Sequence, residues 1–207
     1  MEEYSKIQTI FHRDPLTKNK SLIEGVWSHP AFEYLQNNEW LFTEKIDGTN
    51  IRITFTGDDV IFNGKTNNAQ IPATLVRKLI NLFPLDLFKE LPPLTLYGEG
   101  YGKGIRSGGN YIRDDVNFIL FDIWIDGWWL ERANIEDIAS KLNINTVPII
   151  GRGTLIDAYN KTAEGFQSAI ADCIAEGIVM RPSTMLFDRK GKCIITKIKH
   201  KDFKTNE

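Results

Sequence analysis

The chain has 207 residues, of which 42% are hydrophobic, and its formal net charge is −2. This length and composition are sufficient for a sizeable core and fit one ordinary domain better than two. No stretch approaches the roughly 20 consecutive apolar residues of a membrane span, and the charged N-terminus differs from a signal peptide. We therefore expect a cytoplasmic protein without a membrane segment.

The charge balance argues against a protein that binds duplex mainly through phosphates, and the cysteine pattern argues against a structural zinc site. A protein that binds duplex mainly through phosphates usually carries a basic excess, so any affinity for nucleic acid must come from a local patch. Cys173 and Cys193 lack the paired spacing of a zinc site, and the three histidines lie far apart. We expect both thiols to be free and buried.

The first half of the chain alternates between short strands and helices. Pro30, directly after His29, predicts the first turn of a short helix. A second helix is predicted over residues 71–83 by apolar residues at helical spacing. Several segments are rich in β-formers and bounded by turn residues such as Asp47-Gly48. These predicted strands are residues 40–45, 49–56, 60–64, 94–101 and 116–125.

The second half continues this mixed pattern. Asn134 is a suitable cap for a helix through residues 135–143, and another helix is predicted over 155–173 with an interruption near Gly165. Two strands, 177–181 and 193–199, close the chain. Because no repeat or low-complexity linker is present, we predict an α+β fold with mainly antiparallel strands.

The most unusual segment of the sequence surrounds Lys45, at the end of a predicted strand. Glu44 precedes this lysine, and Asp47, Gly48 and Asn50 follow it. A lysine near its reference pKa of roughly 10.4 is a poor nucleophile, so a catalytic lysine needs cationic neighbours or desolvation to lose its proton. By itself this segment is more typical of a solvated strand edge than of an active site.

Other strands carry polar residues that together could bind a nucleoside triphosphate. Glu99 lies among glycines in an apolar strand, where a carboxylate must find a donor, and Glu176 begins a later strand. Lys197 and Lys199 occupy alternate positions of the last strand and so share one face. Phe118 lies on a strand where plain core packing is also a strong interpretation. Together with Lys45, these residues comprise a nucleophile, a ribose acceptor, a stacking ring, a metal carboxylate and phosphate-binding cations.

Their order along the chain resembles that of the covalent nucleotidyltransferases, which include DNA ligases, RNA ligases and mRNA capping enzymes. The similar segments are EKIDGTN, GKTNNAQ, YGEGYG, FILFDI, EGIVMRP and KIK, which correspond to motifs I, Ia, III, IIIa, IV and V. The likeness extends from about Trp40 to Lys199 and is greatest to the phage RNA ligase 2 group. It implies an α+β, ATP-grasp-like domain of mainly antiparallel sheets flanked by helices.

The resemblance also implies roles for individual residues. Lys45 would form a phosphoramidate with AMP, and Glu99 would contact the ribose. Phe118 would stack on adenine, with Phe121 as the alternative ring. The cofactors implied are ATP and magnesium, or manganese in its place.

The remaining implied roles concern the metal and the phosphates. Glu176 would act through the divalent metal, and Lys197 and Lys199 would bind the phosphates. Glu44 and Asn50 flank the nucleophile as they do in the RNA ligase group.

Two positions depart from the pattern of the RNA ligase 2 group. Lys65 stands where that group usually has arginine, and Arg181 stands where it often has lysine. Positive charge is kept at both positions, but the bidentate fork of a guanidinium is lost at one and gained at the other. Contacts to phosphates or strand ends can therefore differ there.

The chain stops shortly after Lys199, at Glu207. We therefore expect residues 1–207 to form a single nucleotidyltransferase domain, without the oligonucleotide-binding (OB) barrel of DNA ligases or the helical domain of RNA ligase 2. A partner protein could then supply substrate binding. Phosphate loops of the GxxxxGK[ST] type and the GxGxxG fingerprint are absent from the sequence, which disfavours P-loop and Rossmann chemistry.

The leading hypothesis is an ATP-dependent ligase that seals RNA ends through a lysyl-AMP. Asn50 favours RNA over DNA by resemblance, since capping enzymes and many DNA ligases have arginine at that position. A minimal ATP-dependent DNA ligase is the alternative enzyme. A nucleic-acid end-binding module that lacks turnover is the alternative from another class.

Overall fold

The computed structural model describes residues 4–203, and within them the chain forms two compact units. Unit 1 contains Tyr4 and Ile46–Val147, and unit 2 contains Ser5–Lys45 and the residues from Pro148 onward. Residues 1–3 and 204–207 of the predicted domain lie outside the described residues. That residues 1–207 form a single nucleotidyltransferase domain therefore stays a prediction.

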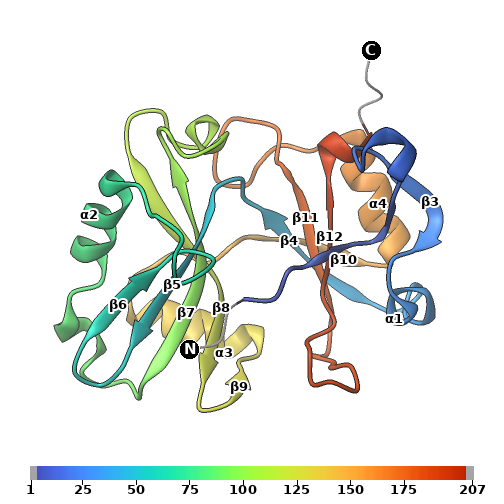
Figure 1. Ribbon diagram of the computed structural model, residues 1–207. Helices are drawn as coiled ribbons and strands as arrows, with labels where there is room; N and C mark the ends of the chain where they lie inside the picture. The colour runs from blue at the N-terminus through green and yellow to red at the C-terminus, as the bar shows by residue number, and fades with distance from the viewer. Residues whose placement is uncertain (1–3, 204–207) are drawn as a thin grey trace. The chain divides into compact units, whose positions relative to one another are not determined.

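Unit 1 is built on an antiparallel sheet of five strands in the order β6-β5-β7-β8-β9 (Figure 1). The strands are β5 (Thr49–Phe55), β6 (Val60–Asn63), β7 (Leu94–Gly102), β8 (Val116–Ile125) and β9 (Trp128–Trp129). Side chains alternate between the two faces of each strand, as the period of two requires. One face therefore carries Ile51, Leu96 and Leu120, while the other carries Asn50 and Glu99.

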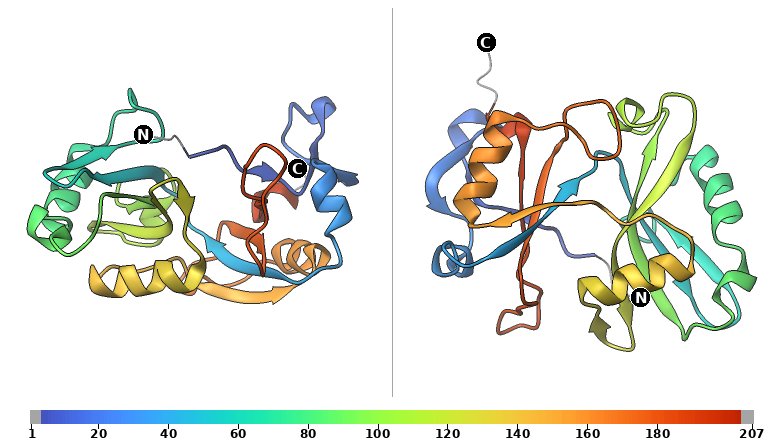
Figure 2. Two further views of the ribbon diagram at one scale, coloured as in Figure 1. Left: turned by 90° about the horizontal axis from the view of Figure 1, so that it is seen from below. Right: turned by 180° about the vertical axis from the view of Figure 1, so that it is seen from behind.

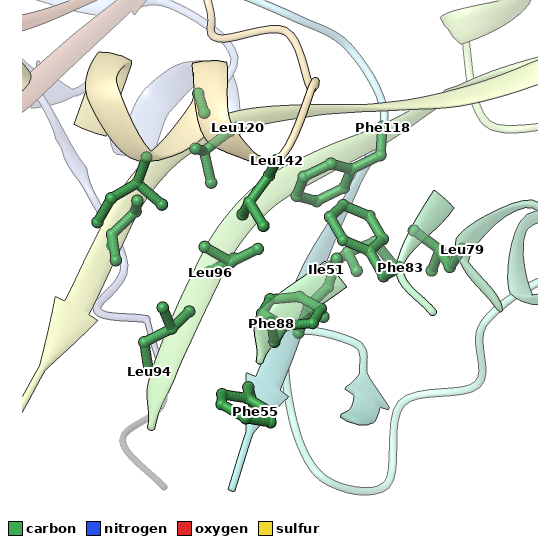
Figure 3. Packing of buried hydrophobic residues seen from close by; sticks show 14 of the residues in the cluster. Ile51, Phe55, Leu79, Phe83, Phe88, Leu94, Leu96, Phe118, Leu120 and Leu142 are labelled. Atoms are coloured by element: carbon green, nitrogen blue, oxygen red, sulfur yellow. The ribbon is translucent and has the colours of Figure 1, made fainter. Parts of the chain in front are cut away.

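Helices cover the apolar face of this sheet. The helical segments of unit 1 are α2 (Ala73–Leu82), α3 (Arg132–Lys141), η2 (Leu85–Phe88) and η3 (Gly108–Asn110). Leu79 of α2 and Phe88 of η2 are fully buried, and they pack with Ile51, Leu96 and Phe118 in the main core (Figure 3). This burial leaves the opposite face of the sheet for polar side chains.

Unit 2 contains a second five-stranded sheet, in the order β1-β12-β11-β4-β10. Its strands are β1 (Gln8–Thr9), β4 (Trp40–Lys45), β10 (Ile149–Gly153), β11 (Gly177–Pro182) and β12 (Thr196–Lys199). The pairing is antiparallel except between β1 and β12. A two-stranded sheet of β2 (Phe11–Arg13) and β3 (Leu22–Trp27) belongs to the same unit.

The helix α4 (Leu155–Glu164) packs against β11 and β12 on one face of the large sheet of unit 2 (Figure 2). The buried core on that face contains Trp40, Phe42, Ile178 and Ile198. The other helical segments of the unit are α1 (Pro30–Tyr34), η1 (Pro15–Thr17) and η4 (His200–Phe203). Within residues 4–203, no helix is long and apolar enough to cross a membrane.

The predicted α+β class with mainly antiparallel strands is confirmed, and most predicted elements are present within a few residues of their expected bounds. The predicted strands 40–45 and 116–125 have the observed bounds of β4 and β8. The Asp47-Gly48 segment, however, does not close a hairpin. It links β4 in the sheet of unit 2 to β5 in the sheet of unit 1.

Several local predictions were wrong. Asn134 lies inside α3 and does not cap it, because the helix begins at Arg132 after Glu131. The helix predicted over 155–173 ends at Glu164, where Gly165 adopts a φ of +78° that favours glycine. Strand β12 begins at Thr196 rather than at Cys193.

The cysteine prediction and the strand inventory also need correction. Cys173 and Cys193 are half-buried, not buried. The strands β1, β2, β3 and β10 were not predicted. Their sequences are short or irregular, so they do not show the alternation that identifies a strand.

Candidate active site

Lys45 is the last residue of β4, and the alternation of this strand decides which way it faces. Trp40, Phe42 and Glu44 are buried on the side of the α4 core, while Thr43 and Lys45 point to the other face and are partly exposed. The sequence therefore places a lysine on an open sheet face at a strand end. Burial of the Trp40 and Phe42 side chains on the opposite face of β4 fixes that orientation.

Glu176 joins Lys45 to a second lysine. The Nζ atom of Lys45 lies 2.6 Å from Oε2 of Glu176, and the Nζ atom of Lys199 lies 2.7 Å from Oε1. Gly177 stands between the two lysines in the cross-strand row Lys45–Gly177–Lys199. A Cβ at Gly177 would lie 2.1 Å from the carbonyl oxygen of Ile198, so only glycine permits this close approach of β11 and β12.

This group of charges is shielded but not sealed from solvent. The side chains of Lys45, Glu176 and Lys199 are 18%, 11% and 19% exposed. Burial by itself raises the pKa of the Glu176 carboxyl, but the charges and hydrogen bonds of Lys45 and Lys199 outweigh it and lower the pKa overall. Glu176 is therefore held as a carboxylate beside two cations.

Further cations lie on the same face of the sheet. Lys197 and Lys199 share this face. Thr196 and Ile198, which alternate with them along β12, are buried on the other face. Arg181 lies on the matching face of β11, two residues beyond Val179, which pairs with Lys197. The predicted phosphate-binding residues of unit 2 thus occupy a single sheet face.

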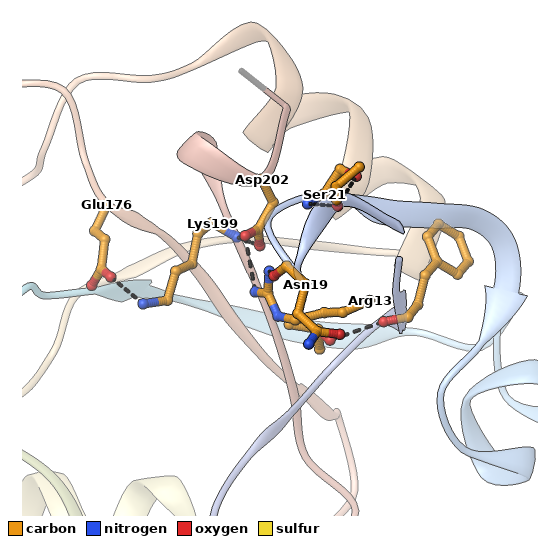
Figure 4. Close-up of polar contacts among 9 residues, drawn as sticks. Arg13, Asn19, Ser21, Glu176, Lys199 and Asp202 are labelled. Atoms are coloured by element: carbon orange, nitrogen blue, oxygen red, sulfur yellow. Dashed lines mark hydrogen bonds and ion pairs between the residues drawn. The ribbon is translucent and has the colours of Figure 1, made fainter. Parts of the chain in front are cut away.

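Asp202 holds the end of β12 where Lys199 lies, a role that the sequence did not reveal. One carboxylate oxygen of Asp202 accepts the backbone N–H of Lys199 at 3.1 Å, and the other accepts Nη2 of Arg13 at 2.9 Å (Figure 4). The Asp202 side chain is only 1% exposed. Arg13 lies far away in the sequence, so no local pattern could have indicated this pair.

Glu44 lies on the opposite face of the sheet from Lys45. It is 1% exposed, and its Oε2 accepts the backbone N–H of Ala169 at 2.8 Å. Ala169 belongs to the segment between α4 and Glu176. The side chain of Glu44 therefore holds this segment instead of facing the lysines, and the structure does not bring it together with the predicted nucleotide-binding residues.

In unit 1, the residues that follow Lys45 lie against β7. A Cβ at Gly48 would lie 2.2 Å from the carbonyl oxygen of Gly100, so the backbone there approaches β7 as only glycine allows. The backbone of Asp47 is similarly close to Gly108, whose hypothetical Cβ would lie 2.9 Å from the Asp47 oxygen. Glycine at these positions fixes the path of the chain beside Glu99.

Asn50 and Glu99 are direct cross-strand neighbours, and Ile119 follows Glu99 in the same row. The Oδ1 atom of Asn50 is buried and has no hydrogen-bond partner among residues 4–203. Buried polar atoms are usually paired, so an unpaired acceptor needs an explanation. A donor from a bound ligand, such as a ribose hydroxyl, would supply the missing bond.

The two candidate stacking rings have different environments. Phe118 is 2% exposed and meets Phe83 edge-on at 5.3 Å within the apolar core (Figure 3). It therefore lies on the face opposite to Glu99. Phe121 lies in a bulge of β8 and is only partly buried, against a cluster that includes Ile119. Phe121 thus belongs to the polar side of the sheet, where Glu99 and Asn50 also lie.

Lys65 is exposed in the loop after β6, where it follows the buried Gly64. No group of three or more His, Cys, Asp or Glu side chains that could hold a metal occurs in the described part of the chain. Magnesium, however, is commonly held by one or two carboxylates together with substrate phosphates. Glu176, ionised and partly exposed, fits a site of that type.

The lowered pKa of Glu176 predicts a specific dependence of stability on pH. A carboxyl whose folded-state pKa lies below its unfolded value stabilises the protein above the unfolded pKa, and the contribution is lost as the pH falls through the folded pKa. Glu176→Gln imitates the protonated form. We expect the wild type to unfold at higher denaturant than Glu176→Gln at pH 7, with the gap closing below about pH 4.

The measurement is urea unfolding of both proteins across this pH range. The same comparison for Glu164→Gln, an acid at the exposed end of α4, is the control and should show a much smaller gap. A difference between wild type and Glu176→Gln that stays constant with pH would contradict the lowered pKa.

Comparisons with known proteins identify the family and the fold of this chain. Residues 38–199 match the model of the family described as RNA ligase. No curated protein matches the sequence. Solved structures of Naegleria gruberi RNA ligase have a similar fold. The form with pyrophosphate has a TM-score of 0.70 and 17% identity, over 96% of this chain and 56% of that chain.

Two variants of the same Naegleria gruberi enzyme are similar to a comparable extent. One, with ATP and manganese, has a TM-score of 0.67 and 20% identity over 84% of this chain and 54% of that chain. The other, with AMP and manganese, has a TM-score of 0.69 and 17% identity over 95% of this chain and 55% of that chain. Our chain thus spans little more than half the length of these enzymes, and such low identity shows the fold alone. The match to the family model, over residues 38–199, covers more than half of the chain, and by it the chain belongs to the RNA ligase family.

Proposed function

We propose that this chain is an ATP-dependent RNA ligase that joins 5′-phosphate and 3′-hydroxyl ends through a covalent lysyl-AMP at Lys45. The observation that carries the proposal is the contact of one carboxylate, Glu176, with Lys45 at 2.6 Å and Lys199 at 2.7 Å. Membership of the RNA ligase family supports the same reaction.

In the first step, the Nζ atom of Lys45 attacks the α-phosphorus of ATP. A nitrogen–phosphorus bond forms, the bond to the bridging oxygen breaks, and pyrophosphate leaves. The ammonium group of Lys45 must lose a proton before the attack, and this proton passes to solvent, to which the side chain is 18% exposed. Lys199 remains paired with Glu176 when Lys45 becomes neutral, so the buried carboxylate keeps a cation beside it.

The next steps transfer AMP to a 5′-phosphate end and then displace it with a 3′-hydroxyl. All three are in-line phosphoryl transfers, in which positioning and charge neutralisation supply most of the rate. We assign phosphate binding to the cationic face of Lys197, Lys199 and Arg181. Their shared orientation on β11 and β12 supports this assignment.

The polar face of unit 1 would bind the nucleoside. Glu99 would accept a hydrogen bond from the ribose, and the buried Oδ1 of Asn50 would accept a second one. We assign adenine stacking to Phe121, because Phe118 is enclosed in the apolar core. Lys65 is assigned to phosphate contact, since it is an exposed cation in the loop that follows β6.

The proposed cofactors are ATP with magnesium or manganese. The Naegleria gruberi structures contain ATP and manganese in one case and AMP and manganese in another. Magnesium bound at Glu176 would neutralise charge on the phosphates during transfer. An enzyme that consumes ATP needs a compartment that supplies it, so the proposal includes a cytoplasmic location.

RNA is the preferred substrate in this proposal, by family membership and by the Asn50 position. The formal net charge of −2 gives the chain little general attraction for a polyanion. Binding should then depend on the nucleotides beside the reactive ends, and a partner protein could strengthen it.

The covalent adduct is the most direct test of the reaction. Incubation with ATP and magnesium should add one AMP to the intact mass of the wild type, and Lys45→Ala and Lys45→Arg should abolish the adduct. The adduct should survive alkali and break in acid, as a phosphoramidate does. Lys161→Arg, at a similarly half-buried lysine of α4, should be labelled normally. An adduct that persists in either Lys45 variant would place the nucleophile elsewhere.

The assignment of the stacking ring predicts a difference between two phenylalanines. Phe121→Leu should raise the ATP concentration needed for half-maximal adduct formation by about tenfold, because stacking on a base is worth roughly 1–3 kcal/mol, and should change the melting temperature little. Phe118→Leu should lower the melting temperature with a smaller effect on the ATP requirement, because its ring packs in the core. The reverse pattern would return adenine stacking to Phe118.

The substrate assignment predicts which ends are joined. With pre-adenylylated strands, which need no ATP, joining should be faster when the 3′-hydroxyl strand ends in ribose than when it ends in deoxyribose, because the 2′-hydroxyl offers an additional polar contact. Joining should also weaken steeply between low and moderate salt. A gel assay with nicked duplexes and free single strands measures both effects. Faster sealing of all-DNA nicks would instead indicate a minimal DNA ligase, and no sealing of any strand would indicate an end-binding module.

A further inference from the structure

Arg52 is a fully buried arginine that the proposed reaction does not use. It lies in the middle of β5, its residue exposure is 0%, and it pairs across the sheet with Asn63 of β6 and Tyr97 of β7. Arginine is almost never fully buried unless its charge is paired or hydrogen-bonded, since the loss of hydration is costly. The groups to which the buried guanidinium of Arg52 donates hydrogen bonds therefore indicate its role.

The guanidinium of Arg52 donates hydrogen bonds to the loop that follows β6. Its Nε donates to the carbonyl oxygen of Gly64 at 3.2 Å, and its Nη2 donates to Oδ1 of Asn67 at 2.6 Å. Residues 65–70 are all exposed and belong to no helix or strand. A charged, planar donor group thus holds two points of a loop that otherwise lies in solvent.

Lys65 lies between these two points. Gly64 precedes it directly, and Asn67 follows it by two residues, so the two acceptors of Arg52 flank the lysine in the chain. The turn in which the N–H of Ala69 bonds to the oxygen of Thr66 at 3.1 Å closes the same loop. Holding the Gly64 carbonyl on one side of Lys65 and the Asn67 side chain on the other restricts the directions in which the ammonium group of Lys65 can extend.

We propose that Arg52 is a positioning residue that orders the 64–69 loop, so that Lys65 is presented to a phosphate group of the reaction. This inference rests on the proposed function, which makes Lys65 a phosphate contact. The phosphate belongs either to ATP or to the 5′ end of the nucleic acid. Arg52 itself touches neither, and it acts through the loop.

The fork of the guanidinium explains why arginine is used at this position. Its N–H groups have a fixed planar geometry, so two acceptors in different directions can be bound at once. A lysine would retain the charge, but its compact ammonium would have to reach both acceptors from a single nitrogen. Ordering the loop before binding also reduces the entropy that is lost when the ligand binds.

The test is a double-mutant cycle on binding, with Asn67→Ala, Lys65→Ala and the double variant. Asn67 is exposed, so its substitution removes one end of the Arg52 contact with little risk to folding. Asn68→Ala, at the neighbouring exposed asparagine, is the matched control. Affinity is measured for the α,β-methylene analogue of ATP and, separately, for a short 5′-phosphorylated RNA. The ligand whose binding changes identifies the source of the phosphate.

For one of the two ligands, we expect Lys65→Ala to weaken binding by about tenfold and Asn67→Ala by about threefold, whereas Asn68→Ala leaves it unchanged. The double variant should bind as weakly as Lys65→Ala alone, because Asn67 acts only through Lys65. Arg52→Lys should resemble Asn67→Ala. Hydrogen exchange should also show faster exchange of the 65–69 amides in Asn67→Ala, with the strands of the sheet unaffected.

Three results would overturn the proposal. The first is a double variant whose fold-loss of affinity equals the product of the two single losses. The second is an Asn67→Ala variant whose affinity matches that of Asn68→Ala. The third is a Lys65→Ala variant that binds both ligands as tightly as the wild type does. The lysyl-AMP adduct is measured on the same preparations. A wild type that forms no adduct defeats the proposed ligase function, whereas the binding cycle decides the role of Arg52 without any turnover.

Discussion

The contact of Glu176 with two lysines is the interaction on which the arrangement of charges on the open sheet face of unit 2 depends. Placing two ammonium groups close together is unfavourable unless an anion lies between them, and a partly buried carboxylate is costly unless cations surround it. Glu176 satisfies both requirements with one oxygen for Lys45 and the other for Lys199. The arrangement also needs Gly177, because any side chain there would collide with the backbone of β12.

In both sheets, successive side chains of a strand point to opposite faces, so that one face forms a core and the other carries polar side chains. In unit 2, the residues that alternate with Lys45, Lys197 and Lys199 face α4 and fill a core, while the lysines face away from it. In unit 1, α2 and α3 cover the apolar face, and Asn50 and Glu99 are left on the other. Each strand therefore contributes to a core and to a polar face at once. A shift of register by one residue would exchange the two faces and destroy both.

Several charged or polar side chains are buried in the fold. They include Arg52, which holds a loop, and Glu44, one of whose carboxylate oxygens is buried without a hydrogen-bond partner among the described residues. The buried Oδ1 of Asn50 likewise has no hydrogen-bond partner within residues 4–203. Such departures from a satisfied core are expected where a protein binds ligands, since the groups must be available to the ligand or hold those that are. Their concentration around the motifs is consistent with a nucleotide-binding role.

The sequence by itself determined the α+β class, the strands that carry the motifs and the candidate nucleophile, because alternation, turn residues and the order of motifs are local properties of the chain. Only the tertiary structure decided which of these residues meet. The pairing of Lys45, Glu176 and Lys199 depends on the register of three strands, and the anchoring of Lys199 by Asp202 and Arg13 joins distant segments. The burial of Phe118 in the apolar core, and the place of Phe121 outside it, likewise depend on a bulge in β8 and on which face α2 covers. Such features follow from long-range packing, which leaves no periodic signal in the sequence.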